Sequence, residues 1–246
     1  MKHRLLDRLL LPARVDRVEQ RAPRLRLITL AGPALAGLDW QPGQHVRLQV
    51  AAAPGAVDWL VGTLRTYSIW DCRDGTLQLM VFDHGDGPGA TWSRTAEPGD
   101  ELMLLKPQGD FTTAPAAYHL FAGEETAQAA YGPMLRDLPA GAGVFARLEV
   151  DGPDDRIDLT EGVDEDRTRN WDLGWDYRRG RSAASAQTLV EAVRGLDLPA
   201  EPGLAYLAGE ARTIQLIRRH LVEDRHWPRR NVRTKPFWTP GRKGLD

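Results

Sequence analysis

Three residues in the first third of the chain have the types that bind a nucleotide phosphate. Arg65, Tyr67 and Ser68 belong to an extended segment, in which a cation and a hydroxyl would point to one side with an aromatic ring between them. A glycine-rich loop at residues 84–92 follows. Glycines let backbone N–H groups approach phosphate oxygens closely, and an arginine adds a bidentate charge-assisted pair. The pattern predicts a cradle for a flavin nucleotide; the alternative is an edge strand with a surface arginine and a turn.

The composition restricts the partners of such a site. The chain has 246 residues, room for two modest domains, and a net charge of −2 from 32 Lys and Arg against 34 Asp and Glu. Because no global positive field exists to displace counterions, nucleic acid is not expected and small molecules are. The single cysteine, Cys72, excludes an internal disulfide, a multi-cysteine zinc site and a protein-ligated iron–sulfur cluster. A redox centre would therefore be an organic cofactor or arrive with the substrate.

Nothing in the sequence predicts a membrane span or a resident metal. Charged residues interrupt the first seven positions too early for a signal peptide, and no run of about 18 apolar residues occurs. The six histidines show no metal-ligand spacing such as His-x-x-x-His. We expect a cytoplasmic protein, and a monomer is favoured although no pattern fixes the oligomeric state.

Short segments of alternating apolar residues predict an antiparallel, flavin-binding β-barrel over residues 1–115. Val46, Leu48 and Val50, for example, alternate with His45, Arg47 and Gln49. Strands this short at this spacing are typical of a barrel. The other predicted strands are Val15–Glu19, Leu25–Leu30, Leu64–Trp70, Leu77–Phe82 and Glu101–Leu105.

Residues 116–246 change to a pattern of strand, glycine and helix. Predicted strands at Tyr118–Ala122 and Leu204–Ala208 are each followed by a glycine, and a third lies at Val144–Val150. An amphipathic helix is predicted over Glu210–Val222. The repetition predicts a parallel α/β nucleotide-binding domain, whose ligands lie where strands end and helices begin. No Gly-x-Gly-x-x-Gly fingerprint is present, so an ordinary Rossmann dehydrogenase is not supported.

Three local features of this second domain bear on its function. Gly132-Pro133 should kink or shorten the helix that follows residue 126. Between Glu149 and Asp166, nine acidic residues accompany one arginine, which predicts a solvated loop that would repel a dinucleotide phosphate. Four arginines are candidates for a 2′-phosphate partner and equally for solvated surface, which we favour for most of them: Arg178, Arg179, Arg181 and Arg212.

Taken in order, the motifs resemble the siderophore-interacting proteins, which are NAD(P)H-dependent ferric-siderophore reductases with a ferredoxin–NADP reductase-like fold. Each motif is weak alone, and the resemblance rests on five in the right order. They are Arg-x-Tyr-Ser at 65–68, His-Gly-x-Gly-Pro at 84–88 leading to Trp92, Pro-x-Gly-x-Phe at 107–111, Ala-Gly-Glu-Glu-Thr at 122–126 and Ala-Gly-Glu at 208–210. Weaker matches are Gly43–His45, Trp175–Arg178 and Phe237-Trp238.

The resemblance implies FAD and NADH or NADPH as cofactors. Arg65 would meet the flavin phosphate, Tyr67 would pack on the flavin, and Ser68 and Trp238 would lie at the flavin edge. The other implied FAD residues are Thr66, His84, Gly87, Ala90, Thr91 and Trp92. The implied NAD(P)H residues are Gly123, Glu124, Glu125, Thr126, Gly209 and Glu210. The family's usual Asp of the first turn is Glu124 here; the alternative role for Glu124 and Glu125 is charge compensation in the first turn of a helix.

The electron chemistry follows from these partners. A nicotinamide gives two electrons as a hydride whereas Fe(III) accepts one, so a flavin must mediate and no side chain need act as acid or base. Siderophore oxygens are hard ligands that hold Fe(II) less well, so reduction would release the iron. The run from Arg225 to Lys243 holds seven basic residues and no acid; a solvated tail is the default, and a rim that steers an anionic ferric siderophore is the alternative. The predicted substrate residues are Lys235, Arg242, Arg47 and Lys106.

Two other functions stay open. The chain could be another flavin reductase, such as the reductase component of an oxygenase, although it lacks ferredoxin cysteines. It could also be a siderophore- or flavin-binding module without efficient dinucleotide use, an alternative that Glu124 and Gly132-Pro133 leave open. Yellow protein that bleaches anaerobically with NADH or NADPH would be a reductase, and yellow protein that does not bleach would have lost its dinucleotide site.

Overall fold

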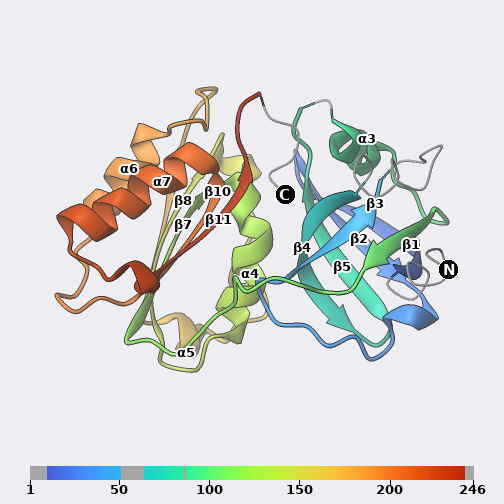
Figure 1. Cartoon of the computed structure of the whole chain (residues 1–246), viewed down its shortest axis with the longest axis horizontal. Helices are drawn as coiled ribbons and strands as arrows, with labels where there is room; N and C mark the ends of the chain where they lie inside the picture. Colours follow the sequence, from blue (N-terminus) through green and yellow to red (C-terminus); the bar gives the residue numbers. More distant parts are fainter. Residues whose placement is uncertain (1–9, 51–63, 86, 242–246) are drawn as a thin grey trace, which may run out of the picture. The chain divides into compact units, whose positions relative to one another are not determined.

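The chain forms two compact units that divide after Thr112 (Figure 1). The computed structural model describes residues 10–50, 64–85 and 87–241. Arg242, one of the predicted substrate residues, lies outside the described residues. Within the described ranges, no helix combines the length and apolar character needed to cross a membrane.

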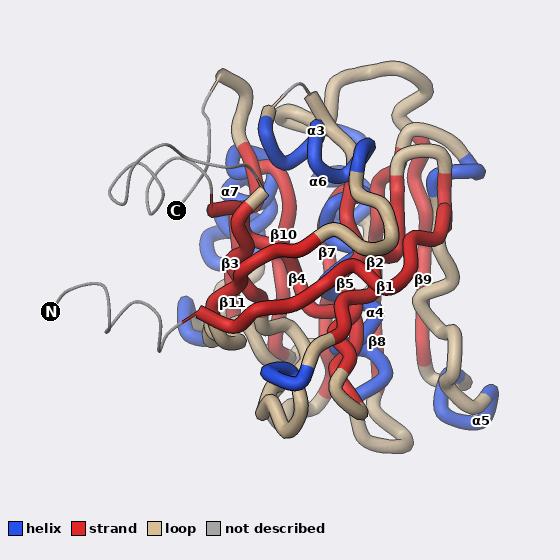
Figure 2. The backbone as a smooth tube through the Cα atoms, turned by 90° about the vertical axis from the view of Figure 1, so that its right-hand side faces the viewer, coloured by secondary structure: helices blue, strands red, loops and turns tan. Residues whose placement is uncertain are grey.

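The first unit is a closed antiparallel barrel. Its strands are β1 (Leu10–Ala22), β2 (Leu25–Ala31), β3 (His45–Gln49), β4 (Leu64–Arg73), β5 (Thr76–Phe82) and β6 (Glu101–Leu105), in the order β1-β2-β5-β4-β3-β6. Val46, Leu48 and Leu104 are fully buried in its core, because successive side chains point in and out of the barrel. Helix α3 (Pro88–Thr95) lies at one end, where Trp92 joins this core (Figure 2). A 3-10 turn, η1 (Pro33–Leu35), follows β2.

The second unit is a parallel five-stranded sheet covered by helices. Its strands are β7 (Tyr118–Glu124), β8 (Gly143–Val150), β9 (Trp171–Tyr177), β10 (Leu204–Glu210) and β11 (Val232–Trp238), in the order β11-β10-β7-β8-β9. Helices α6 (Gln187–Arg194) and α7 (Ala211–Arg219) cover one face and α4 (Gln128–Asp137) the other (Figure 1). The shorter elements are η2 (Glu125–Ala127), η3 (Pro153–Asp155), α5 (Glu165–Thr168), the π-helical turn η4 (His220–Asp224) and η5 (Arg229–Asn231).

The predicted architecture of a β-barrel followed by a parallel α/β sheet is confirmed. In α7 the apolar stripe of Ile214 and Ile217 is buried while Arg212 and Gln215 are exposed, as the periodicity requires. The predicted start of this helix is shifted by one residue, since Glu210 ends β10 and caps α7 from outside. The barrel strand predicted at Val15–Glu19 is also longer than expected, because β1 begins at Leu10.

The expected shortening of the helix at Gly132-Pro133 is wrong. Helix α4 continues through Pro133 to Asp137 and all its residues from Gln128 to Leu135 are buried. Tyr131 anchors it, since its hydroxyl lies 2.7 Å from the carbonyl oxygen of Ala122 and accepts a 2.8 Å hydrogen bond from the amide of Ala208. Packing of this kind offsets the loss of one helical hydrogen bond at a proline.

The acidic segment between Glu149 and Asp166 is more ordered than its charge suggested. Glu149 belongs to β8 and is buried. Further along, the buried Ile157 donates its amide to the side chain of Gln128 on α4, at 2.9 Å. Arg156 lies over the ring of Trp175, 4.9 Å from its centroid. A hydrogen bond and a cation–π contact therefore hold the segment against the sheet unit. Most of its acids, such as Asp154, Asp158 and Glu161, are exposed, as the charge density predicts.

The basic run near the end of the chain is not a solvated tail. It contains β11, the edge strand of the sheet, in which Val232 is buried against the core of the unit. Trp227, just before it, is also buried and packs edge-on against Tyr118. Basic residues such as Arg233 and Lys235 alternate along an edge strand, where charges discourage pairing with another chain.

Candidate functional site

Arg65 and Tyr67 on β4 converge on the beginning of α3. A β-carbon built on Gly89, in the first turn of α3, would lie 2.8 Å from the Tyr67 hydroxyl and 3.5 Å from Cγ of Arg65. The rings of Tyr67 and Trp92 are 5.4 Å apart. A β-carbon at position 89 would have to displace the Tyr67 hydroxyl, so strand and helix pack closely and form one surface with a cation, a phenol and backbone amides. We call Arg65, Tyr67 and Gly89 the cradle.

Ser68 does not share this face. Residues of a strand alternate, and Tyr67 lies opposite the buried Val46 of β3 whereas Ser68 lies opposite His45. Thr66 is likewise opposite Arg47. The expectation that Arg65, Tyr67 and Ser68 point to one side is therefore wrong for the serine. Thr66, Ser68 and Arg47 form a second group on the other side of the same strands.

The loop before α3 is held by arginines. Nη1 of Arg94 donates to Oδ1 of Asp83 at 2.8 Å and to the carbonyl oxygen of Gly85 at 3.2 Å. Arg26 donates to the carbonyl oxygens of Ser93 and Arg94, at 2.7 and 2.8 Å, near the end of the helix. His84 is exposed and stacks on Phe82 with the ring centroids 5.9 Å apart. These contacts hold the loop before α3 and the end of the helix in place.

The cradle has the chemistry that a flavin nucleotide needs. The N-cap of α3 is Gly87, which has no side chain to accept the first amides, and the first turn carries no acidic residue. Such a helix start favours a phosphate, and a neighbouring arginine strengthens it. The other predicted residues of α3 divide by burial, with Ala90 and Trp92 buried and Thr91 exposed. The donor set and the space kept by Gly89 fit FAD.

At the carboxyl end of the parallel sheet, Glu124 is buried and fully engaged. Its carboxylate accepts hydrogen bonds from the amide of Thr126 at 3.1 Å, from the Thr126 hydroxyl, and from the indole N–H of Trp238 at 3.0 Å. Burial, and then the neighbouring charge of Glu125, raise the pKa of Glu124 to about 7 against the opposing effect of these donors. The side chain therefore stabilises this turn by hydrogen bonds inside the protein.

Glu210 plays the matching part at the end of β10. It accepts from the amides of Arg212 and Thr213, at 3.0 and 2.8 Å, and so caps α7. The amide of Ser185 donates to it from a third segment, at 3.2 Å. Burial alone would raise its pKa, but the hydrogen bonds from these amides overcome burial and hold the pKa of Glu210 below its ordinary value.

Glu125 is paired with Arg178, which follows β9. The guanidinium forms a bidentate pair with the Glu125 carboxylate, and its Nη1 lies 3.6 Å from Oε1 of Glu149. All three side chains are buried, and we call Glu125, Glu149 and Arg178 the buried triad. Burial raises the pKa of Glu149 to about 7 although the charge of Arg178 opposes the shift.

From the sequence, Glu149 was treated only as one of nine acids in a solvated segment. Its position near the end of an apolar strand was the one feature of the sequence that indicated burial.

The two glycines of these turns are required by packing. A β-carbon on Gly123 would lie 2.3 Å from the carbonyl oxygen of Ala208, the residue beside it on β10. Gly209 has φ of +121°, and a β-carbon there would lie 2.6 Å from Oε1 of Glu124. The turns after β7 and β10 are thus packed directly against each other.

The four arginines considered for a 2′-phosphate are now distinguished. Arg178 belongs to the buried triad and so has no part in such a contact. Arg179, Arg181 and Arg212 are exposed. Arg181 Nε donates to the carbonyl oxygen of Arg178 at 3.0 Å. Among the predicted substrate residues, Lys106 is exposed just after β6, while Arg47 and Lys235 are half-buried on β3 and β11.

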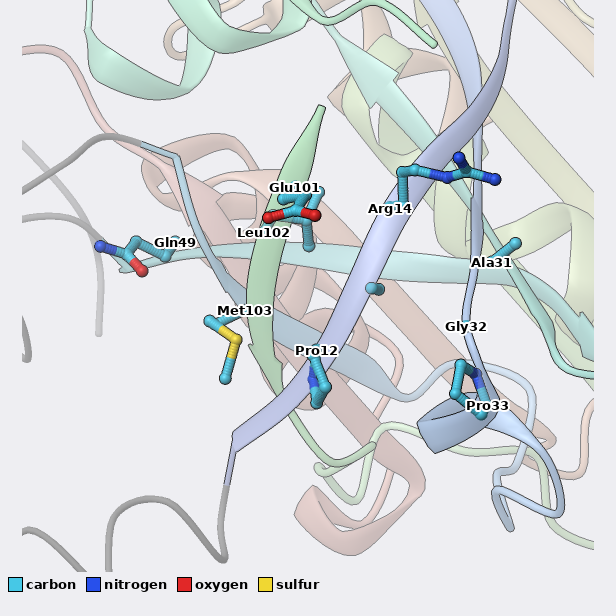
Figure 3. A pocket seen from close by; sticks show the side chains of 10 residues that line it. Pro12, Arg14, Ala31, Gly32, Pro33, Gln49, Glu101, Leu102 and Met103 are labelled. Carbon is cyan, nitrogen blue, oxygen red and sulfur yellow. The ribbon is translucent and has the colours of Figure 1, made fainter. Parts of the chain in front are cut away.

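A separate groove of about 630 Å³ opens on the outside of the barrel (Figure 3). It is lined by side chains of β1 and β6, such as Pro12, Arg14, Glu101 and Met103, and by Pro33 of η1. Arg14 and Glu101 are register partners on these strands. None of the predicted site residues lines this groove, and the sequence did not predict a groove here.

Together, the flavin-type cradle on a β-barrel and the nucleotide-type edge of a parallel sheet define a two-domain flavin reductase fold. Residues 14–111 match the siderophore-interacting FAD-binding domain and residues 116–241 match the siderophore-interacting protein domain. The chain belongs to the siderophore-interacting protein family.

Individual relatives agree with this assignment. Ferric vibriobactin reductase ViuB of Vibrio cholerae is 28% identical over 184 residues, which cover 72% of this chain and 65% of ViuB. The match thus spans less than two thirds of that relative's length. A siderophore utilization protein from T. fusca has a similar structure, with a TM-score of 0.80 and 25% identity over 96% of this chain and 95% of its own. The siderophore-interacting protein SipS from Aeromonas hydrophila gives 0.79 and 25% over 95% and 93%.

Proposed function

We propose that the protein is a ferric-siderophore reductase that passes electrons from NAD(P)H through FAD to an Fe(III)-siderophore and releases Fe(II). Support comes from the family of both domains and from ViuB, whose name gives it as a ferric vibriobactin reductase. The observation that carries the proposal is the cradle, where Gly89 lets a helix start approach Arg65 and Tyr67. Bound FAD would supply the change from two-electron to one-electron transfer, and the protein would supply alignment.

The proposed division of labour follows the two units. Arg65 and the amides at the start of α3 would hold the flavin phosphates, with Tyr67 against the flavin ring and the motif residues of 84–92 around them. Trp238 is proposed to act at the flavin edge, whereas Thr66 and Ser68 lie on the face of β4 away from the cradle. The turns at 123–126 and 209–210 would receive NAD(P)H through their backbone, because the carboxylates of Glu124 and Glu210 are occupied by protein donors. We propose that this happens in the cytoplasm, in a monomer.

The test is to purify the protein and follow its colour. The expected result is yellow protein whose visible absorbance bleaches anaerobically on addition of NADPH or NADH. Adding a ferric siderophore should restore the yellow colour and produce Fe(II), trapped by a ferrous-specific chelator. Protein that binds no flavin would overturn the proposal.

A second function is favoured by one observation, the density of acids at the sheet edge. Glu124, Glu125, Glu149 and Glu210 are all buried there, with Arg178 in the same cluster. Negative charge at this edge opposes a pyrophosphate. A flavin- and siderophore-binding module that uses dinucleotide poorly would be yellow but would not bleach, while dithionite would still reduce it.

The substrate is proposed to be an anionic ferric siderophore. Lys235 on β11, and Arg47 and Lys106 in the barrel, are the described cations that would steer it, and Arg242 is a further candidate by sequence. Lys235→Ala should lower the second-order reduction rate of an anionic chelate but not of a neutral hydroxamate complex, and added salt should narrow the difference. Arg218→Ala, on α7, is the matched charge control. An equal loss of reduction rate with the anionic and the neutral complex would indicate that Lys235 has a structural role.

A further inference from the structure

The end of β11 reaches across β10 to contact both Gly-Glu turns. The indole N–H of Trp238 donates to Oε1 of Glu124 at 3.0 Å, and the hydroxyl of Thr239 lies 3.4 Å from Oε1 of Glu210. Because β10 lies between β11 and β7, the first of these bonds spans two strand positions. Consecutive residues thus tie the last strand to the turns after β7 and β10.

Two backbone features make this crossing possible. Gly209 pairs with Pro236 but Glu210 pairs with Trp238, so Phe237 is an extra residue on β11. Such a bulge turns the following side chain away from its regular direction. On β10, the position between Glu124 and Trp238 is Gly209, where a β-carbon would lie 2.6 Å from Oε1 of Glu124. Any side chain at 209 would occupy the space in which carboxylate and indole meet.

Both carboxylate oxygens of Glu124 are hydrogen-bonded within the protein and so do not contact a ligand. It is 1% exposed, one oxygen accepts from the Thr126 hydroxyl and Trp238, and the other accepts from the Thr126 amide. The Thr126 amide and the Trp238 indole can only donate, and the Thr126 hydroxyl donates to the carboxylate, so together they favour a carboxylate over a carboxyl group.

The other charged and titratable groups around Glu124 do not change the conclusion that its hydrogen-bond donors favour the ionised carboxylate. On its own turn Glu125 is paired with Arg178, which follows β9. Tyr131 of α4 is buried, and burial holds its pKa well above the ordinary value, so it stays neutral. Gly209 faces it from β10, and the neutral indole of Trp238 contacts it from β11. Burial and the charge of Glu125 favour protonation of Glu124, and its donors oppose it.

We propose that Glu124 is a positioning residue that holds the indole of Trp238 across Gly209, and that this clasp is firm while Glu124 is ionised and loosens when it takes up a proton. The contribution to catalysis rests on the proposed function, in which Trp238 acts at the flavin edge. The clasp itself depends on neither flavin nor dinucleotide.

The test observes the indole N–H of Trp238 by NMR in the flavin-free and flavin-bound protein. The chain has eight tryptophans, and Trp238→Phe identifies the resonance that belongs to Trp238. In the wild type this resonance should shift with a midpoint near pH 7, following the carboxyl group it contacts. Trp40 and Trp171 donate to backbone carbonyl oxygens, of Cys72 and Ala142, and their resonances should stay constant in the same spectra.

Variants of Glu124 separate the clasp from a general change of structure. Glu124→Gln should abolish the titration of Trp238. Glu124→Asp keeps the charge but shortens the reach by one methylene, and should speed hydrogen exchange of the Trp238 indole by on the order of tenfold or more, as loss of a hydrogen bond to a charged group predicts. If the Glu124 variants do not fold, the carboxyl titration of Glu124 should move to higher pH in Trp238→Phe, which removes a donor.

The two hypotheses fail in different ways. A Trp238 resonance that is constant across about pH 6 to about pH 8, or that titrates equally in Glu124→Gln, would overturn the clasp whatever the enzyme assays show. Titration in a protein that never bleaches with NAD(P)H would retain the clasp and overturn the proposed function. Where both hold, the pH dependence of kcat/KM for NAD(P)H should be flatter in Glu124→Gln than in the wild type.

Discussion

Arg65 and Tyr67 in the barrel are half-buried, whereas Glu124, Glu125 and Glu210 at the end of the parallel sheet are almost fully buried. The barrel residues lie against a helix start that has no side-chain cap and no acidic residue in its first turn. The sheet residues accept hydrogen bonds from protein amides, a guanidinium and an indole. The same kind of motif thus leaves its polar groups partly exposed in one unit and turns them toward the protein in the other.

The comparison shows that a motif residue can act in two ways. If Arg65 contributes its charge to FAD binding, as we propose for the cradle, its removal should weaken FAD binding and leave the fold intact. At the sheet edge, the glutamates determine the shape of turns whose backbone would receive the dinucleotide, so their removal should change the fold first.

The largest effect is expected from Arg178→Ala. The change leaves Glu125 and Glu149 buried without their cation, and breaking a buried ion pair by removal of one partner typically lowers the free energy of unfolding by about 3–5 kcal/mol. Urea unfolding monitored by circular dichroism measures it. The control is Arg179→Ala, at the exposed neighbouring position, which should stay within about 0.5 kcal/mol of the wild type. A loss below about 1 kcal/mol in Arg178→Ala would mean that water reaches the buried triad.

Arg65→Ala should weaken FAD binding and leave the fold intact. Losing a charged partner of a phosphate raises the dissociation constant of FAD by roughly 10- to 150-fold, which corresponds to about 1.5–3 kcal/mol. The unfolding free energy of the flavin-free protein should change little because Arg65 is half-exposed. Titration of flavin-free protein with FAD gives the affinity. Arg73→Ala, an exposed arginine at the other end of β4, is the control; full flavin occupancy in Arg65→Ala would remove this residue from the site.

Most of the fold followed from periodicity, and the exceptions have physical causes. Strands such as β3 and β8 and the helix α7 have one apolar face against the core, so their patterns were clear. Strands β9 and β11 lie at the edges of the sheet, where both faces accept polar residues and the alternation is weak. Helix α4 tolerates Pro133 because tertiary contacts outweigh local propensity.

For the site, the sequence indicated which residues matter better than what they touch. Arg65, Tyr67 and Gly89 come together as residues of a strand and a helix start. The contacts of Arg178 with Glu125 and of Trp238 with Glu124 join residues far apart in the chain. No local pattern encodes such a pairing, because it depends on the order of strands in the sheet.

A smaller effect is expected from adding a methyl group to the cradle. In Gly89→Ala the new carbon would lie 2.8 Å from the Tyr67 hydroxyl, so the ring or the helix must move, at a cost of about 1–3 kcal/mol in stability and with weaker FAD binding. Gly87→Ala is the matched control, since no atom lies within 4 Å of its β-carbon and its φ of −76° suits alanine. Equal stability of the two flavin-free variants would contradict the close approach of Tyr67 to α3.

The smallest effect concerns pH and the buried triad. The pKa of Glu149 is raised from 4.5 to about 7, so between these values the folded protein holds a proton that the unfolded chain has lost. The stabilisation from this group is complete below about pH 4.5 and is lost as the pH rises through about 7. Glu149→Gln cannot lose a proton, so relative to the wild type it should gain on the order of 1 kcal/mol between pH 5 and pH 8.

Glu210 should show the opposite sign, which makes Glu210→Gln the informative partner experiment. Its pKa is depressed by the amides that it caps, so its carboxylate stabilises the fold above the ordinary glutamate pKa, and that stabilisation is lost only as the pH falls through the depressed value. The glutamine variant should therefore lose stability relative to the wild type at pH 8 and lose less in more acidic solution. Urea unfolding of both variants over this range tests the pair. If the unfolding free energies of Glu149→Gln and Glu210→Gln changed with pH in the same way, the two carboxyl groups would share one environment. That result would contradict our conclusion that burial keeps Glu149 protonated whereas amide hydrogen bonds keep Glu210 ionised.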